Sequence, residues 1–244
     1  MCYNIAYIEK RAERISAHYG AFFKPEDRQL KFFHVSGFVH PQVYVITQEE
    51  PQWIQAYEWG LIPAWCKDEK QAEEINNHTL NAMCETIFEK PSFRASIRKK
   101  RCLVIVSGFY EWHTLGKKKF PFYIHHKSGE FFSMGGIYEH WLNKTTGELH
   151  RTFSIITTPA NRLLSVIHNS KMRMPLIFTK KDEKQWIHHD LSKEKITSLM
   201  KPLPDGELKA YSVSRRITNR KLNSNTEEVM EPLDYTELQG LNFN

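Results

Sequence analysis

Short stretches rich in β-branched and aromatic residues recur along the chain and predict a protein built mainly of β-strands. Turn residues bound most of these stretches, which are KFFHVSGFV, QVYVITQ, RCLVIVSGFYEW, FPFYIHH, EFFSMGGIYEHWL, HRTFSIITT, MPLIFT and LKAYSVS. The segment LNKTTGELH lies between two of them and is typical of a hairpin turn.

Helical periodicity is less frequent. EKRAERISAHYG has a helical pattern closed by Gly20, and NHTLNAMCETIFEKP is expected to be helical as far as Pro91. In TPANRLLSVIH we expect Thr158 as the N-cap and Pro159 at the first helical position. KDEKQWIHHDLSKEKITSLM predicts one or two more helices. Because strands outnumber helices without a βαβ rhythm, we predict a single α+β domain with a mostly antiparallel, barrel-like sheet and flanking helices.

Charge divides the chain into two parts. The 244 residues carry a formal net charge of +6, whereas residues 219–244 contain two basic and five acidic side chains. We therefore predict a basic globular domain over residues 2–218 and an acidic C-terminal tail over 219–244, either poorly ordered or an extended strap. A basic domain is compatible with a polyanionic partner, although charge alone does not require one.

The four cysteines are Cys2, Cys66, Cys84 and Cys102, and none belongs to a CxxC pair. Their spacing argues against a zinc site, so we expect no metal and no cofactor. The N-terminus lacks a basic region followed by an apolar stretch, and no run of about 18 apolar residues occurs. We therefore expect neither a secretory signal nor a membrane span, and free thiols in a reducing, intracellular compartment.

Cys2 follows the initiator methionine directly. Removal of Met1 would leave an α-amine and a thiol on adjacent carbons of one residue. The α-amine has a reference pKa near 8, so part of it is neutral at pH 7 and can attack an aldehyde to form an imine. The thiol can then close a five-membered thiazolidine ring. The alternatives are an N-terminal nucleophile that attacks an amide and an ordinary buried cysteine.

Three further polar residues are candidates for chemistry. In VSGFYEW, Glu111 shares a strand face with Phe109, so aromatic neighbours would raise the pKa of its carboxyl group. Asn81 and Glu85 would share one face of the predicted helix, from which Asn81 could orient an amine or a carbonyl. His168 would end the helix that Thr158 begins, where the helix dipole favours the protonated imidazole. Each residue also has a purely structural interpretation.

Aromatic and basic segments indicate possible contacts with nucleic acid. Trp59 and Trp65 bracket the turn in WGLIPAW, where exposed rings could stack on unpaired bases or, alternatively, pack in the core. FRASIRKKR could contact phosphates or simply be solvated. Lys171 and Arg173 follow His168 in a short basic loop.

The order of six motifs resembles the SOS-response-associated peptidase (SRAP) family over residues 2–215. These motifs are Cys2 behind Met1, WGLIPAW, NAMCET, RCLVIVSGFYEW, TFSIITTPAN and IH…RMP. The resemblance implies a bacterial, cytoplasmic and monomeric protein of the DNA damage response, which is nucleoid-associated when bound to DNA. It implies a positively charged groove for single-stranded DNA that contains abasic sites. The mature Cys2 would capture the ring-opened aldehyde as a thiazolidine DNA–protein crosslink that shields the lesion. Abasic-site lyase activity and autoproteolytic removal of Met1 are further activities that the resemblance raises.

Residue by residue, the resemblance implies that Cys2 is the nucleophile, that Asn81 positions it, and that Glu111 is an acid/base. His168 would move protons at the sugar oxygen. The expected DNA-binding positions are Trp65, Thr158, Lys171, Arg173, Asn4 and Met83. Thr158 is also expected to bind phosphate as part of a helix N-terminus.

Two of these positions depart from the family. Asn4 and Met83 stand where the family has arginines, and the segment NSKM lengthens the spacing between His168 and the RMP sequence, where Lys171 restores one charge. Two other functions stay open from the residues alone. They are an N-terminal-nucleophile cysteine peptidase and a non-enzymatic module that binds single-stranded DNA.

Overall fold

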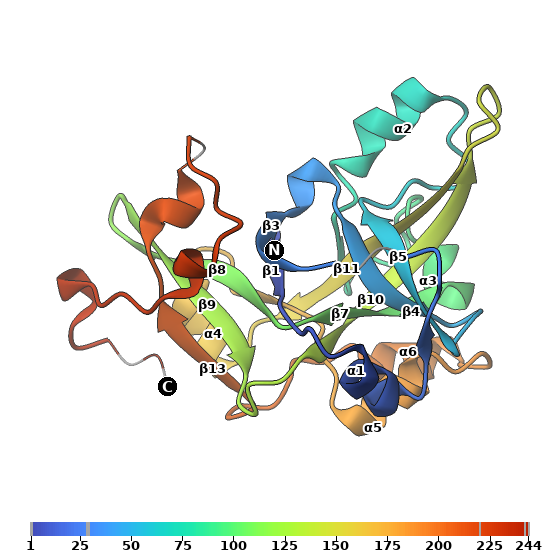
Figure 1. The fold of residues 1–244 in the computed structure, drawn as a ribbon. Helices are drawn as coiled ribbons and strands as arrows, with labels where there is room; N and C mark the ends of the chain where they lie inside the picture. The colour runs from blue at the N-terminus through green and yellow to red at the C-terminus, as the bar shows by residue number, and fades with distance from the viewer. Residues whose placement is uncertain (1, 28–29, 220, 242, 244) are drawn as a thin grey trace.

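The strands form two sheets, which meet where the chain passes from β7 to β8 (Figure 1). The computed structural model describes residues 2–27, 30–219, 221–241 and 243. β7 (Arg101–Val106) belongs to the larger sheet and β8 (Gly108–Leu115) to the smaller one, with Ser107 alone between them. A Cβ atom on Gly108 would lie 2.4 Å from the ring of Tyr123, so glycine permits the close packing at this junction. The segment predicted as one strand, RCLVIVSGFYEW, is therefore two.

The larger sheet closes on itself. Its strand order is β12-β11-β10-β7-β4-β5-β2, and β11 also pairs in parallel with β5 through Thr152↔Glu58 and Phe153↔Trp59. Strands β11, β10, β7, β4 and β5 thus form a barrel, which confirms the predicted barrel-like sheet. The remaining bounds in this sheet are β2 (Phe22–Phe23), β4 (Gln42–Thr47), β5 (Trp53–Trp59), β6 (Asn81–Met83), β10 (Phe132–Leu142), β11 (Leu149–Pro159) and β12 (Arg173–Pro175). β10 and β11 form the predicted hairpin.

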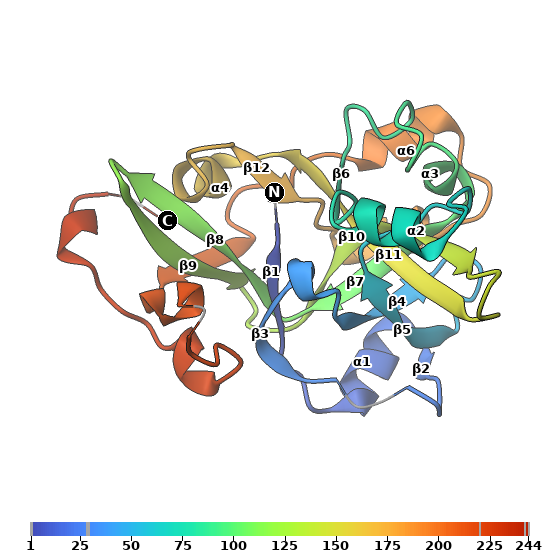
Figure 2. The same cartoon turned by 90° about the horizontal axis from the view of Figure 1, so that it is seen from above.

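The smaller sheet has the order β13-β9-β8-β1-β3, with β1 between β8 and β3 (Figure 2). The bounds are β1 (Asn4–Tyr7), β3 (Phe32–Ser36), β9 (Lys118–His126) and β13 (Leu208–Ser212). β1 pairs with β8 only through Ile5↔Phe109 and Ala6↔Gly108. The edge of β8 beyond Phe109 therefore has no strand partner on that side among the described residues, and it faces the start of the chain.

Six α-helices lie around the sheets in the described part of the chain. They are α1 (Ala12–Tyr19), α2 (Glu69–Asn76), α3 (Ser96–Lys99), α4 (Arg162–Ile167), α5 (Lys180–Trp186) and α6 (Lys193–Leu199). The prediction for α1 is confirmed, since Gly20 ends it in the left-handed region with φ 66°. Two helices, α5 and α6, follow residue 179, which agrees with the prediction for that segment.

Two predictions of helix structure are wrong. Residues 81–83 form β6, which pairs in parallel with β11, so Asn81 and Glu85 do not share a helix face. Thr158 lies inside β11 with no exposed surface, and Asn161 is the N-cap of α4, accepting a hydrogen bond from Leu164 N at 3.0 Å. Thr158 therefore offers no helix N-terminus to a phosphate.

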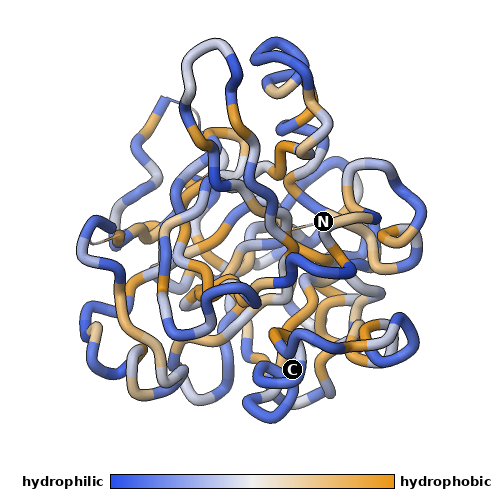
Figure 3. Tube along the Cα trace, turned by 90° about the vertical axis from the view of Figure 1, so that its right-hand side faces the viewer, coloured by the Kyte–Doolittle hydropathy of each residue, from blue (hydrophilic) through white to orange (hydrophobic). Residues whose placement is uncertain are grey.

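The interior is aromatic and aliphatic, and the polar segments lie on the outer turns (Figure 3). Trp59 is fully buried and stacks on Phe153, so it belongs to the core. Arg101 is also fully buried. Its guanidinium donates to the carbonyl oxygens of Ile97, Arg98, Trp186 and His188 at the ends of α3 and α5. Arg101 therefore does not contact phosphate, because it satisfies helix C-termini instead.

Residues 221–241 pack against the smaller sheet rather than extending from it. Val229, in the 3₁₀ turn η3 (Glu227–Met230), is fully buried together with Ala6, Tyr110 and Val213. Oδ1 of Asn225 accepts a hydrogen bond from Phe33 N at 2.8 Å. Two further 3₁₀ turns are η2 (Arg215–Thr218), which precedes residues 221–241, and η4 (Thr236–Leu238), which lies near their end. Another 3₁₀ turn, η1 (Gly37–Val39), follows β3. We call residues 221–241 the strap.

Candidate functional site

Cys2 lies two residues before the start of β1 and has no exposed surface. Its Sγ lies 3.9 Å from the carbonyl oxygen of Asn4. The pKa of the thiol is raised well above its ordinary value, first by burial and then by the neighbouring carboxyl group of Glu111. Because only a thiolate is strongly nucleophilic, this thiol is not activated for direct attack.

Asn81 holds the main chain of Cys2. Its Nδ2 donates to the carbonyl oxygen of Cys2 at 2.8 Å, across 79 positions of sequence. The backbone of Asn81 is fixed in turn, because β6 pairs with β11 through Asn81↔Ile155. Oδ1 of Asn81 is buried and makes no hydrogen bond with a described residue. The side-chain amide thus holds Cys2 through Nδ2, while Oδ1 is available to a ligand.

Glu111 projects from β8 into the core side of the smaller sheet, as its alternation with Tyr110 predicts. It is 4% exposed, and its Oε1 has no hydrogen-bond partner among the described residues. Burial raises the pKa of the carboxyl group from 4.5 to about 8. Glu111 is therefore protonated over much of the neutral range and can donate a proton.

His168 follows the last residue of α4 and is 7% exposed. Its Nδ1 lies 2.9 Å from the carbonyl oxygen of Arg173 and 3.6 Å from Oε2 of Glu111. Since a carbonyl only accepts, Nδ1 carries the proton and the lone pair is on Nε2. Burial lowers the pKa of His168 from 6.5 to about 4. The predicted stabilisation of the imidazolium by the helix dipole is wrong, because desolvation outweighs the dipole of a six-residue helix.

Arg173, at the start of β12, is clamped rather than free. Its guanidinium makes two contacts with the carboxylate of Glu85, and Nη2 donates to the carbonyl oxygen of Thr157 at 2.7 Å. The arginine is mostly buried, whereas Glu85 is 43% exposed. Any phosphate that binds Arg173 must therefore compete with Glu85.

The other predicted DNA-binding residues lie at different depths. Trp65 and Met83 are exposed, and Nε1 of Trp65 donates to the carbonyl oxygen of Pro91 at 3.3 Å. Lys171 is exposed in the turn after α4. Asn4 is half-buried, and its Oδ1 is 2.9 Å from Nε2 of His34. Cys2, Asn81, Glu111, His168 and Arg173 are thus brought together, with exposed side chains around them and Thr158 buried.

His34 and the ion pair of Arg173 are two features of the site that the sequence did not predict. His34 is 8% exposed, and its Nδ1 contacts the hydroxyl group of Ser224 at 2.7 Å. Together with the bond to Asn4, this contact links the strap to the start of β1. Nothing in the local pattern around residue 34 signals such a link, because Ser224 is 190 positions away.

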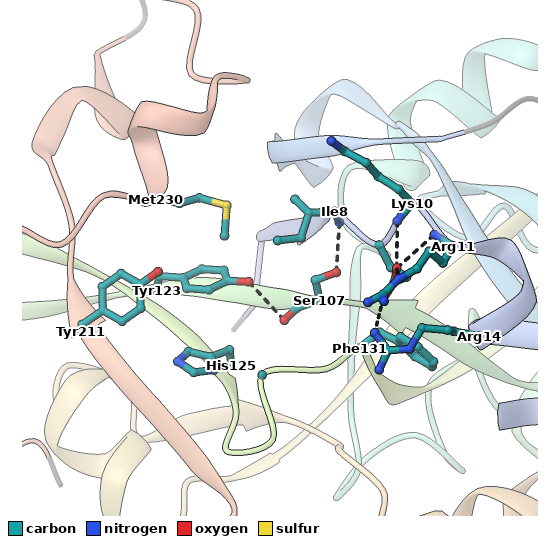
Figure 4. Close-up of a pocket in the computed structure, with 12 residues that line it drawn as sticks. Ile8, Lys10, Arg11, Arg14, Ser107, Tyr123, His125, Phe131, Tyr211 and Met230 are labelled. Atoms are coloured by element: carbon teal, nitrogen blue, oxygen red, sulfur yellow. Dashed lines mark hydrogen bonds and ion pairs between the residues drawn. The ribbon is translucent and has the colours of Figure 1, made fainter.

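Two cavities differ in what their polar groups do. A cavity of about 660 Å³ lies between residues 8–14, β9 and β13 (Figure 4). Several of its polar groups pair with one another. Tyr123 OH donates to the carbonyl oxygen of Ser107 at 3.1 Å, and Arg11 and Arg14 pair with Glu9. Tyr123 stands opposite Tyr110, so it lies on the other face of the sheet from Glu111.

The second cavity, of about 370 Å³, adjoins the site, and Glu111 and His168 line it. The two catalytic candidates thus border an open space that a substrate can enter. With a protonated acid, a neutral imidazole and a placed cysteine side by side, the arrangement suits proton transfer to and from a substrate oxygen. We call this space the catalytic cavity.

Comparisons with known proteins agree with the geometry. Residues 1–220 match the family model described as "SOS response associated peptidase (SRAP)". The chain is 41% identical over 168 residues to the abasic site processing protein YoqW of Bacillus subtilis, which covers 68% of this chain and 71% of that protein. It is 32% identical over 208 residues to the abasic site processing protein YMR114C of Saccharomyces cerevisiae, covering 82% of this chain and 54% of that protein.

A solved structure is similar along nearly the whole chain. The crystal structure of a protein from Bacteroides thetaiotaomicron superposes with a TM-score of 0.86 at 40% identity, covering 95% of this chain and all of that chain. In the described part of the chain, no helix combines the length and apolar character needed to span a membrane.

Proposed function

Because the chain belongs to the SOS response associated peptidase family, we propose that it processes abasic sites in DNA and does so by covalent capture. In this proposal the mature N-terminal Cys2 binds the aldehyde of the opened sugar as a thiazolidine. The observation that carries the proposal is the pair of uncharged groups beside Cys2. Glu111 keeps its proton and His168 has lost its own, so an acid and a base stand together at one pH.

The first step opens the sugar ring. An abasic sugar exists mainly as a cyclic hemiacetal, whose opening needs a proton removed from the hydroxyl group and a proton added to the ring oxygen. His168 accepts the first through Nε2, and Glu111 supplies the second. The product is an aldehyde with a free hydroxyl group, and no oxidation or reduction takes place.

The second step forms the crosslink. The neutral α-amine of Cys2 adds to the aldehyde carbon, and the carbinolamine loses one water molecule to give an imine. The thiol then adds across the C=N bond, so that sulfur bonds to carbon and the thiol proton passes to nitrogen. One water molecule is lost overall. Because the imine activates its own carbon, a protonated thiol is sufficient at this stage, which is consistent with its high pKa.

The residues around the site support single-stranded DNA as the partner. Arg173 offers a guanidinium to phosphate, and Trp65 offers an exposed ring on which an unpaired base can stack. Lys171 adds positive charge beside His168, as its influence on the pKa of His168 indicates. These contacts position the lesion over Cys2, while the reaction itself belongs to the buried groups.

A cysteine peptidase is the second candidate, and the state of the thiol argues against it. Such an enzyme needs a thiolate or an adjacent base at Sγ. Here burial raises the pKa of Cys2, and the contact of Sγ is with a main-chain carbonyl oxygen. Lyase activity and self-removal of Met1 are separate steps, which assays of strand cleavage and of the mass of the purified chain can detect.

Intact mass spectrometry tests the proposal directly. The purified chain is incubated with single-stranded DNA that contains one abasic site. We expect a species with the mass of the chain without Met1 plus the DNA, minus one water molecule. Cys2→Ala and Cys2→Ser each keep an α-amine but lack the thiol, so neither should give a stable adduct unless borohydride traps the imine. Cys66→Ala, which changes a buried cysteine far from β1 in sequence, is the matched control. An adduct of unchanged yield with Cys2→Ala would refute the proposal.

A further inference from the structure

The cavity shown in Figure 4 lies on the face of the smaller sheet opposite to Glu111 and takes no part in the chemistry proposed above. Its volume of about 660 Å³ is typical of small-molecule sites. Its two ends differ in character. Lys10, Arg11 and Arg14 form the basic end, and Tyr123, His125, Tyr211 and Met230 form the aromatic end, with Ser107 between them. Such a cavity suits a ligand with an anionic group at one end and a planar ring at the other.

The basic end is held in place and still has donors to spare. Oε1 of Glu9 accepts from Nε of Arg11 at 3.1 Å, and Oε2 accepts from Nη1 of Arg14 at 3.1 Å. The side chain of Glu9 is only 11% exposed, so it fixes both guanidinium groups. Neither Nη group of Arg11 makes a hydrogen bond to a described residue, and Lys10 forms no ion pair with an acidic residue in the same ranges. These groups are available to an external anion.

A phosphate fits the basic end better than a carboxylate does. Glu130, in the loop before β10, pairs with Arg14, and its side chain is 49% exposed. The three basic side chains outnumber Glu9 and Glu130, so this end remains positive even with both carboxylates in place. A phosphate monoester carries about −1.5 to −2 charges at neutral pH and has three acceptor oxygens, whereas a carboxylate has one charge and two oxygens. The phosphate can displace the exposed Glu130 while Glu9 continues to hold the arginines.

The aromatic end offers stacked rings and an acceptor. The ring of His125 stacks on that of Tyr123 with an interplanar angle of 18°, and Tyr211 packs against both at centroid distances of 5.6 and 5.9 Å. Nδ1 of His125 donates to the carbonyl oxygen of His126 at 2.9 Å, so the lone pair is on Nε2. Neither Nε2 of His125 nor the hydroxyl group of Tyr211 forms a hydrogen bond within the described part of the chain. This end can therefore accept a hydrogen bond from a stacked, planar ligand.

The floor between the two ends is preformed. The main-chain N–H of Ser107 donates to the carbonyl oxygen of Ala6 at 2.8 Å, and its hydroxyl oxygen accepts from the N–H of Ile8 at 3.0 Å. The carbonyl oxygen of Ser107 accepts from Tyr123 OH at 3.1 Å. Ser107 is 8% exposed, and its own hydroxyl proton has no acceptor among the residues that the structure describes. A ligand that spans the cavity thus meets one further donor at its middle.

From these observations we infer that this cavity binds a free mononucleotide, with the phosphate at the basic end, the sugar over Ser107 and the base against the aromatic end. The base should carry an exocyclic amino group, because Nε2 of His125 accepts a hydrogen bond. Adenine has such a group, whereas hypoxanthine has an oxygen in its place. The site is separate from the proposed DNA site, and nothing in it depends on Cys2 or on crosslinking.

Isothermal titration calorimetry of the full chain tests the site with three probes. The probes are adenosine 5′-monophosphate, adenosine and inosine 5′-monophosphate. We expect adenosine 5′-monophosphate to bind at least about tenfold more tightly than adenosine, which lacks the phosphate. It should bind about threefold to tenfold more tightly than inosine 5′-monophosphate, which lacks the amino group. Saturating single-stranded DNA without an abasic site should not change its affinity.

Variants of the basic end locate the phosphate. Lys10→Gln and Arg11→Gln should each lower the affinity for adenosine 5′-monophosphate by about threefold to tenfold and leave that for adenosine unchanged. Both side chains are exposed, so neither substitution should prevent folding. Glu130→Gln should raise the affinity, because it releases Arg14. Lys144→Gln is the matched control, since Lys144 is exposed in the turn between β10 and β11, outside the cavity.

The results that would overturn the site are distinct from those that bear on crosslinking. Equal affinities for adenosine 5′-monophosphate and adenosine would exclude a phosphate site, and so would unchanged affinities in both Lys10→Gln and Arg11→Gln. Displacement of the nucleotide by single-stranded DNA would place it in the DNA site instead. None of these measurements involves an adduct, so failure of the nucleotide site leaves the proposed function standing, and failure of crosslinking leaves the nucleotide site standing.

Discussion

Nδ1 of His168 lies 3.6 Å from Oε2 of Glu111, although burial leaves both side chains uncharged at neutral pH. Their pKa values, about 4 for the imidazole and about 8 for the carboxyl group, are in the reverse of the usual order. Between these values the pair contains one group that can donate a proton and one that can accept it. In an ordinary ion pair of histidine and glutamate these roles would be exchanged, with the imidazolium as the donor and the carboxylate as the acceptor.

The rate of adduct formation should depend on pH in a bell-shaped manner. It rises as the α-amine of Cys2 loses its proton near pH 8, and it falls as Glu111 ionises above its pKa of about 8. Glu111→Gln should lower the maximum by about 10²- to 10⁴-fold and remove the falling limb. Single-turnover rates from pH 5 to pH 10 measure both effects. A wild-type rate that keeps rising to pH 10 would contradict the role of Glu111 as the acid.

Stability should also depend on pH through the same groups. Because the pKa of Glu111 is raised from 4.5 to about 8, its contribution is complete below about pH 4.5 and is lost as the pH rises through about 8. His34 and His168 act in the opposite direction, since their pKa values fall from 6.5 to about 4. Their contributions are present above about pH 6.5 and are lost as the pH falls toward 4.

From these three groups we expect the free energy of unfolding to be greatest near pH 6.5. Above that pH it should decrease by roughly 1.4 kcal/mol per unit until Glu111 has ionised. Glu111→Gln should abolish this decrease, and urea unfolding between pH 5 and pH 9 measures the difference. Parallel curves for the wild type and the variant would show that the carboxyl group is not kept neutral by the fold.

Asn81→Ala should slow the reaction without preventing DNA binding. Loss of the 2.8 Å hydrogen bond to the carbonyl oxygen of Cys2 frees the reactive end of the chain to move. A displacement of about 1 Å can cost about 100-fold in rate, so we expect a 10- to 100-fold lower rate constant at saturating DNA. The dissociation constant for undamaged single-stranded DNA should not change. Asn77→Ala, in the exposed turn after α2, provides the control. A higher dissociation constant with an unchanged rate would assign Asn81 to DNA binding instead.

Glu85→Gln should strengthen DNA binding. The substitution removes the carboxylate that occupies Arg173, so phosphate no longer has to displace it. We expect about threefold to tenfold tighter binding at low salt and a steeper dependence on salt by about 0.7 in the log–log slope, which corresponds to one more phosphate contact. Fluorescence anisotropy at several salt concentrations measures both quantities.

Glu89→Gln is the matched control for this prediction, because Glu89 is exposed four residues later in the same loop. In the background of Arg173→Gln, the effect of Glu85→Gln should disappear. If the gain in affinity persists there, it reflects general charge repulsion rather than release of Arg173.

Local sequence was sufficient where one strand determines its own environment. The alternation of Phe109, Tyr110 and Glu111 predicted a carboxyl group on an apolar face, and its raised pKa follows from that burial. Local sequence was insufficient where pairing with a distant segment determines the secondary structure. NAMCET has a helical pattern, yet Asn81 is in a strand because the edge of β11 is available to pair with it.

Competition between neighbouring elements explains the other errors. Thr158 and Pro159 form a good helix start in isolation, but pairing of Pro159 with Arg173 extends β11, and the helix begins after Asn161. His168 occupies the predicted helix end, although its protonation state is set by the surrounding core rather than by the helix. The link from Ser224 through His34 to Asn4 joins three distant segments, and no local pattern encodes it.

The strap extends the folding unit of this protein beyond the residues that the family model matches. The family match ends at residue 220, whereas Val229 and Leu238 are buried beyond it. A protein shortened to residue 218 would leave Ala6 and Tyr110 uncovered and would deprive His34 of Ser224. Removing the last tenth of the chain would therefore disturb its first few residues, where Cys2 lies. Proteolysis near residue 220 would therefore change the surroundings of Cys2, although the cut lies near the other end of the polypeptide.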